Sequence, residues 1–167
     1  MKKRLILIVL LVAVLVLGTV FAAYARSGGR ITGAMKAEYF TGWNWLQINV
    51  DASDPEFPSG FIKYRSWTEA PNEWGYWRAE PVCVSFGEYE GKPAASVVAI
   101  VTEEDSESTE VGQYATALFV DGGPNAKNDL IGVVTWFQDD VIDDCAFNDN
   151  WFMSWSGVGG NITIHNP

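Results

Sequence analysis

The sequence predicts an all-β domain of about eight antiparallel strands, arranged as an up-and-down β-barrel. Three observations lead to this prediction. Apolar and polar residues alternate in several segments, later segments are apolar on both faces, and clusters of Gly, Pro, Asp and Ser separate them. No window of twelve residues after Ala25 shows a helical period.

The early segments show the period of two that is typical of strands with one buried face. In segment 31–40, Lys36 and Glu38 fall on one face, whereas Met35 and Ala37 fall on the other. We therefore expect a half-buried strand here. The same alternation predicts further strands at 45–50, 62–65 and 82–86.

Later segments are short, apolar on both faces and rich in Val, Ile and aromatic residues, which predicts central strands. A last short strand is expected near the C-terminus, after a glycine-rich turn. The central strands are expected at 94–101, 114–120 and 130–137, the last strand at 162–165, and turns at 54–60, 90–93, 121–124 and 157–160. The acidic segment 102–110 is expected to be a polar loop.

Strands joined by short turns fit two arrangements, a closed up-and-down barrel or a two-sheet β-sandwich. The short connections favour pairing between sequence neighbours, and closure removes exposed sheet edges. We therefore favour the barrel, with the sandwich as the alternative.

The first 25 residues have the three parts of a secretory signal peptide. A basic stretch, Met1–Arg4, precedes an apolar run from Leu5 to Leu17, and Ala23–Ala25 has the small-x-small pattern of a cleavage site. The alternative is an uncleaved membrane anchor, since the apolar stretch has about the length that spans a bilayer. Both alternatives place a single β domain, residues 26–167, outside the cytoplasm or at the cell surface.

The chain is acidic, with 11 basic and 21 acidic residues. Removal of Lys2, Lys3 and Arg4 with the signal peptide leaves 8 basic residues and a net charge of −13. Binding to nucleic acid depends on clustered Lys and Arg, so nucleic acid is not an expected partner. The same argument disfavours an anionic membrane surface, which leaves an uncleaved N-terminal segment as the expected route to a membrane.

Two cysteines, Cys83 and Cys145, lie in the exported part of the chain. An even number of cysteines in an oxidising compartment predicts a disulfide. It would close a loop of about 60 residues and stabilise the fold by about 4 kcal/mol in the chain-entropy account. Two buried thiols are the alternative.

Eight tryptophans are many for a domain of this size, and most are expected in the core or in strand pairs. Two clusters differ because they lie beside Gly and polar residues near expected turns. A flat aromatic face at a strand end stacks on sugar rings or lines the mouth of a ligand-binding barrel. The candidate ligand-binding residues are Trp43, Trp45, Trp74, Tyr76 and Trp77.

One acidic cluster, Asp139, Asp140, Asp143 and Asp144, has enough carboxylates to bind Ca²⁺, which takes six to eight oxygen ligands. Its spacing fits no recognised calcium loop, so a solvated hairpin is the alternative, and no cofactor is required. The only histidine, His165, lies two residues from the C-terminus, where a structural or solvated role is expected. No catalytic motif stands out.

Several segments together resemble exported bacterial β domains of the post-COAP-1 type. They are Gly29–Gly33, Ser59–Tyr64, Asp121–Pro124 with Asp129, and Gly160–His165. The chain departs from that pattern in its tryptophan content and in the acidic segment 102–110. The resemblance implies export, a β architecture and association with cell-surface proteins, and it supplies no catalytic residues.

These observations favour a non-catalytic binding domain for extracellular carbohydrate or a small apolar ligand. The second hypothesis is a structural or interaction module of the cell envelope, whose tryptophans would be buried. The third is a carboxylate-dependent enzyme, which requires a deep cleft with an unusual carboxyl group. The oligomeric state does not follow from the sequence.

Overall fold

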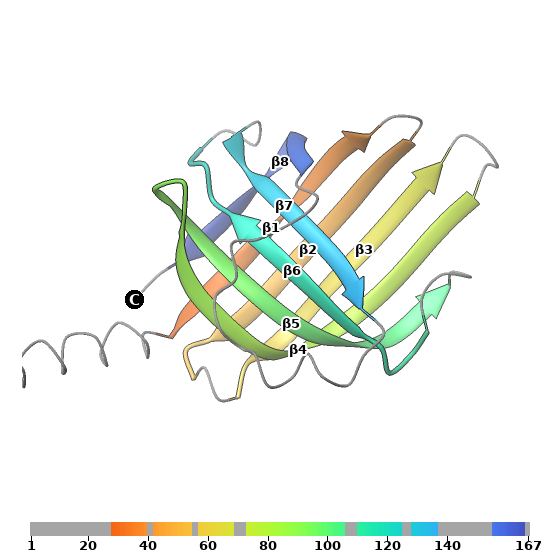
Figure 1. Cartoon of the computed structure of the whole chain (residues 1–167), viewed down its shortest axis with the longest axis horizontal. Coiled ribbons are helices and arrows are strands. Elements are labelled where there is room, and N and C mark those ends of the chain that lie inside the picture. The colour runs from red at the N-terminus through yellow and green to blue at the C-terminus, as the bar shows by residue number, and fades with distance from the viewer. Residues whose placement is uncertain are drawn as a thin grey trace, which may run out of the picture.

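A computed structural model of the chain describes residues 28–39, 42–54, 57–68, 73–105, 110–124, 128–136 and 155–165. They form eight strands and no α-helix in this part of the chain (Figure 1). The strands are β1 (Gly29–Tyr39), β2 (Gly42–Ala52), β3 (Ser59–Thr68), β4 (Glu73–Tyr89), β5 (Lys92–Asp105), β6 (Tyr114–Val120), β7 (Leu130–Trp136) and β8 (Trp155–His165).

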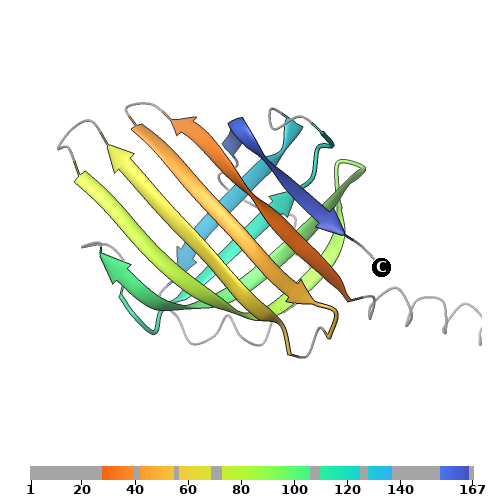
Figure 2. The same ribbon diagram turned by 180° about the vertical axis from the view of Figure 1, so that it is seen from behind.

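Each strand pairs in an antiparallel manner with its neighbour in the sequence, and β1 also pairs with β8. The ring of pairings is therefore complete, and among the described residues two residue pairs join β7 to β8. The sheet curls through 268°, so it forms an incomplete barrel. Figure 2 shows β1 to β4 side by side, with β5 to β7 behind them.

The all-β, antiparallel, up-and-down prediction is confirmed in this form. All eight strands belong to one curled sheet, so the chain does not form the two-sheet sandwich that was the alternative. Short connections favour this result, because strands that follow one another in the sequence usually lie side by side.

Alternation places one face of each early strand in the core. Met35 and Ala37 are buried, whereas Lys36 and Glu38 are exposed. The interior is filled by branched and aromatic side chains, with small residues on β5 and β6 making room for them. The largest fully buried hydrophobic side chains are Phe119, Ile31, Met35, Ile48, Ile62, Ile162, Val50, Val97, Val101 and Val120.

The strands that are apolar on both faces are buried on both faces. In β5 every residue from Ala94 to Ala99 is buried, and in β6 the same holds from Ala117 to Val120. Ala94, Leu118 and Val120 form a second apolar cluster with Leu130 and Tyr89, separate from the main core. The prediction of central strands is confirmed for 94–101 and 114–120, whereas at 130–137 the structure shows the strand β7 and the burial of its later residues stays a prediction.

Two strands extend beyond their predicted ranges. β4 begins at Glu73, well before the strand predicted at 82–86, and has register shifts at Arg78/Ala79 and Pro81/Cys83. Bulges there bend the strand and place a proline, which has no N–H to donate, where the regular ladder is interrupted. β5 likewise extends to Asp105, into the segment expected to be an acidic loop.

The predicted glycine turn at 157–160 is wrong, because these residues lie within β8. Gly160 has φ +97°, and a Cβ there would lie 2.0 Å from the Ala34 carbonyl oxygen. Glycine is needed at this position because the strands approach too closely for a side chain. The register between β1 and β8 shifts nearby, between Lys36 and Ala37, so this glycine accommodates an irregular pairing rather than a chain reversal.

Two aspartates satisfy the edge of β8 that β7 leaves unpaired. Asp129 is fully buried, and its carboxyl oxygens accept hydrogen bonds from Gly122 N at 2.8 Å and Ile162 N at 2.7 Å. Asp121 accepts hydrogen bonds from Gly123 N at 2.8 Å and Ile164 N at 3.0 Å. Ile162 and Ile164 are two residues apart, so their N–H groups point to the same edge. Asp121 and Asp129 thus replace part of a strand ladder with side-chain acceptors.

The apolar N-terminal segment and Cys145 lie outside the described residues, so the signal peptide, the anchor and the disulfide stay predictions. Cys83 is buried on β4, and its side chain has a bonding or contact partner. No free cysteine occurs among the residues that the structure describes. Within the same residues, no helix is long and apolar enough to span a membrane.

We predict that Asp129→Asn lowers the free energy of unfolding by about 3 kcal/mol, because the amide has one acceptor oxygen where two N–H donors now bind a carboxyl group. Urea denaturation monitored by circular dichroism measures this change. The control is Asp105→Asn on the exposed end of β5, for which we expect a change within about 0.5 kcal/mol. Similar changes in both variants would contradict the role of Asp129 at the seam.

Candidate functional site

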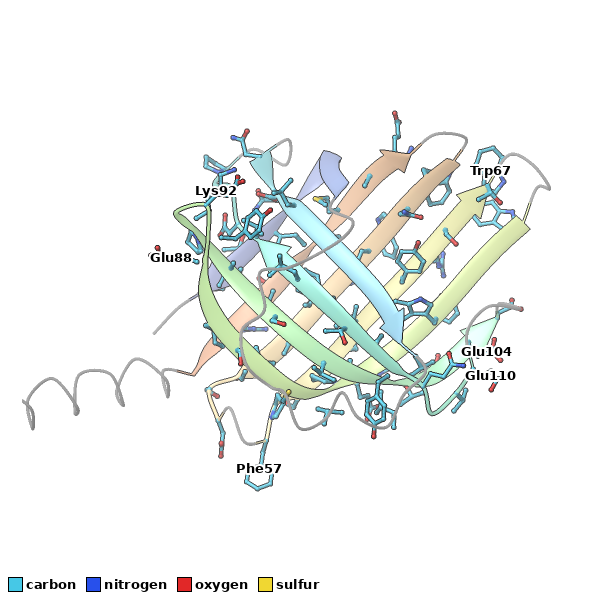
Figure 3. The ribbon with its side chains drawn as sticks, in the orientation of Figure 1. Phe57, Trp67, Glu88, Lys92, Glu104 and Glu110 are labelled. Atoms are coloured by element: carbon cyan, nitrogen blue, oxygen red, sulfur yellow. The ribbon has the colours of Figure 1, made fainter. Side chains whose placement is uncertain are left out.

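Aromatic side chains gather on the outer side of β2, β3 and β4, near the connection between β3 and β4. In the strand register Trp43 lies opposite Trp67, and Trp67 lies opposite Trp74. The rings of Trp43 and Trp74 meet edge to face, with centroids 5.4 Å apart. Trp74 is 62% exposed, and Trp43 and Trp67 are partly exposed. Figure 3 shows Trp67 at the end of β3 that leads to β4.

The next row of the same surface alternates cations and aromatic rings. Lys36 of β1 lies opposite Trp45 of β2, Trp45 opposite Arg65 of β3, and Arg65 opposite Tyr76 of β4. Residues two apart on a strand share a face, so this row lies about 7 Å from the row of tryptophans. We call the surface formed by Trp43, Trp45, Trp67, Trp74 and Tyr76 the tryptophan face.

Each cation of this region lies over an aromatic ring. The Lys36 Nζ is 5.4 Å from the centre of the Trp43 ring, and the Arg65 guanidinium is 6.0 Å from Trp45 and 5.5 Å from Tyr76. Such contacts are worth about 0.5–1 kcal/mol at exposed positions. They hold long, flexible side chains in defined places on the surface, which lowers the entropy that a ligand contact would cost.

Tyr76 also belongs to a polar group at the border with β5. Its hydroxyl donates a hydrogen bond to Glu103 Oε2 at 3.3 Å, while Arg78 forms an ion pair with Glu103 Oε1 at 2.9 Å. Partial burial raises the pKa of Tyr76 above its ordinary value, and the charge and hydrogen bond of Glu103 raise it further. The phenol therefore stays protonated and acts as a donor at neutral pH.

Trp77 is separated from the other predicted ligand-binding residues, because it points into the barrel. It is 3% exposed and stacks on Tyr64 with ring centroids 5.2 Å apart. The Tyr64 hydroxyl in turn donates a hydrogen bond to Asn44 Oδ1 at 2.8 Å, which satisfies two polar groups inside the barrel. Trp77 is thus part of the packed interior, whereas Trp43, Trp45, Trp74 and Tyr76 share the outer surface.

One small cavity lies inside the described part of the barrel, between Met35, Asn44, Leu46 and Tyr64. Its volume is about 10 Å³, which is room for about one water molecule. A ligand pocket for a small organic molecule needs about 300 Å³ or more. This cavity is therefore too small for such a ligand.

The predicted calcium ligands and His165 complete the set of candidate site residues. Asp139, Asp140, Asp143 and Asp144 lie outside the described residues, so the calcium site stays a prediction. Among the residues that the structure does describe, no group of three or more His, Cys, Asp or Glu side chains is placed to hold a metal ion. His165 is exposed at the end of β8, opposite Arg30 of β1.

Sequence reasoning missed three members of this surface, namely Trp67, Lys36 and Arg65. Trp67 has no other tryptophan close to it in the sequence. Lys36 and Arg65 are single basic residues that belong to no motif. Strand alternation carries the missing signal. Once 73–80 is recognised as a strand, Trp74 and Tyr76 fall on one face and Trp77 on the other.

Comparisons with protein-family models, with curated proteins and with solved structures find no match for this chain.

We predict that Glu103→Gln lowers the pKa of Tyr76, because the substitution removes the charge that disfavours the phenolate. The raised pKa means that the contribution of the phenol to stability is intact below pH 10 and is lost as the pH rises through the folded-state pKa. NMR titration of ¹³C-labelled tyrosine, with Tyr76→Phe to assign the signal, measures the shift. Glu88→Gln, at the far end of β4, serves as the control. An unchanged Tyr76 titration in Glu103→Gln would contradict this assignment.

Proposed function

We propose that the protein is a non-catalytic carbohydrate-binding domain that acts outside the cytoplasm and binds sugar chains on the tryptophan face. The single observation that supports this proposal best is the cluster of three register-matched tryptophans on the outer side of β2 to β4. Flat aromatic rings stack on the apolar faces of sugar rings, and an open strand surface accepts a long polymer without the need for a closed pocket.

The arrangement of polar groups supports the same proposal. The Tyr76 hydroxyl and the guanidinium of Arg65 lie beside the rings, where they can bind hydroxyl groups of a sugar that stacks on Trp45. Sugars present both apolar faces and hydroxyl edges, so they match a surface that alternates rings and hydrogen-bond donors. The cavity between Met35, Asn44, Leu46 and Tyr64 has no room for a small apolar ligand, so this proposal places the ligand on the outer surface.

We also propose that the incomplete barrel behaves as a closed one in solution, held at the β7–β8 seam by Asp121 and Asp129. A stable seam keeps the outer sides of β1 to β4 in a fixed curvature. We propose as well that the domain is exported and is similar to domains of the post-COAP-1 type. Export would bring it into contact with extracellular polysaccharide. An interaction module for another envelope protein is the alternative, because Trp, Tyr and Arg are also enriched at protein interfaces.

The test is binding to a panel of soluble neutral and acidic polysaccharides, followed by isothermal titration calorimetry. We expect binding to at least one polysaccharide, and a loss of affinity of about tenfold or more in Trp74→Ala and in Trp43→Ala, because each removes a stacking ring. Phe57→Ala is the matched control, since Phe57 is 77% exposed and lies in the β2–β3 connection, far from Trp67 in Figure 3.

Absence of binding to every polysaccharide would contradict the proposal. Equal losses in Phe57→Ala and Trp74→Ala would place the binding elsewhere. Capture of a protein partner that Trp74→Ala abolishes, without polysaccharide binding, would favour the envelope interaction module instead.

A further inference from the structure

The outer side of β1 to β4 is locally basic although the chain is acidic. Of the 8 basic residues in 26–167, five are on this side. They are Arg30, Lys36, Lys63, Arg65 and Arg78. The basic residues are therefore concentrated on the surface that also carries the exposed tryptophans.

Two rows of this surface hold cations without carboxylates, whereas Arg30 lies opposite Asp51 and Glu38 lies opposite Trp43 in the flanking rows. The row Lys36–Trp45–Arg65–Tyr76 and the next row, Ala34–Gln47–Lys63–Arg78, hold four cations and no carboxylate on β1 to β4. Arg78 is paired with Glu103 of β5. Lys36, Lys63 and Arg65 form no ion pair with any residue that the structure describes. These three cations are held against rings of Trp43, Phe61, Trp45 and Tyr76 instead.

We propose that the ligand of the tryptophan face is an acidic polysaccharide, whose carboxylate or sulfate groups bind Arg65, Lys36 and Lys63 while its sugar rings stack on the tryptophans. This inference rests on the proposed function and names the class of sugar. Arg65 is central in the row, and its planar guanidinium can bind a carboxylate or sulfate with two parallel hydrogen bonds. A cation already placed between two rings needs little further ordering to make such contacts.

The negative charge of the whole chain does not oppose this binding at close range. Charges farther apart than about 8 Å are largely screened at physiological ionic strength, so the cations next to the ligand dominate. The described carboxylates of the β4–β5 connection and of the end of β5 have a second effect, because they repel an acidic polymer that approaches those regions. The charge pattern therefore directs the polymer to the tryptophan face.

An anionic membrane is a weaker fit to the same surface. Binding at a bilayer interface requires apolar side chains that protrude into it. Among the described residues, Trp74 is the one large hydrophobic side chain of this face that is mostly exposed, while Trp43, Trp45 and Trp67 are partly covered. Rings that lie within the surface suit a ligand that lies along it.

The experiment is an array of polysaccharides in which each acidic member is paired with its neutralised form. Polygalacturonate is placed beside its methyl ester, heparin beside desulfated heparin, with xylan and β-glucan as neutral members and phosphatidylglycerol vesicles as a membrane probe. We expect the native protein to bind at least one acidic polymer and to lose that binding when the same backbone is neutralised. The member that is bound distinguishes carboxylate from sulfate recognition.

Equal binding to acidic and neutralised forms, or binding to xylan or β-glucan alone, would overturn the inference and leave the proposed carbohydrate binding intact. Binding to vesicles without any polysaccharide, or no binding at all, would overturn both.

Substitutions of the cations test which residues bind the acidic polymer. We expect Arg65→Gln and Lys36→Gln each to lower affinity for the acidic polymer by about tenfold, as loss of a charge-assisted contact does. Lys92→Gln is the matched control, because Lys92 lies at the β4–β5 turn away from the tryptophan face (Figure 3). Near-ultraviolet circular dichroism of the stacked Tyr64 and Trp77 pair reports whether each variant is folded. Equal affinity in Lys36→Gln and Lys92→Gln, with both folded, would overturn the role of Lys36.

Discussion

The buried carboxyl group of Asp129 is the interaction on which the shape of the sheet depends. The described pairing between β7 and β8 covers two residue pairs at the start of β8, so the N–H groups of Ile162 and Ile164 need acceptors from elsewhere. Asp129 and Asp121 supply them from one connection, 2.7 and 3.0 Å from the N–H groups of Ile162 and Ile164. An unsatisfied buried N–H costs about 1–3 kcal/mol, so these acceptors stabilise the curled sheet at this edge.

Curvature then divides the chain into two surfaces with different roles. The inner side is filled by apolar side chains, and polar groups there are paired with one another, as Tyr64 is with Asn44. The outer side of β5 and β6 is buried as well. The outer side of β1 to β4 exposes tryptophans and cations to solvent, so this surface is the proposed site of ligand binding.

Alternation in the sequence was sufficient to predict the strands and to separate the buried from the exposed side of β1 and β2. It missed the first part of β4, because only 82–86 was predicted as a strand there, and Trp77 was grouped with residues on the opposite face. The glycines at 157–160 were misassigned because glycine marks both turns and close strand approach, and only the position of the Ala34 carbonyl distinguishes them. The acceptor role of Asp129 depends on a residue 33 positions away, so no local pattern contains it. The same is true of the row that joins Lys36, Trp45, Arg65 and Tyr76.

Binding of a polysaccharide on the tryptophan face is tested most directly by NMR of the tryptophan indole N–H signals. The protein is titrated with the polysaccharide that binds most tightly. Indole groups report individually on contact with a ligand, so the binding surface can be located without any substitution. We expect the signals of four outer residues to shift together and saturably, namely Trp43, Trp45, Trp67 and Trp74. The signal of the interior residue Trp77 should stay in place. A shift of Trp77 with little change in the outer tryptophans would contradict binding on the tryptophan face and place the ligand inside the barrel.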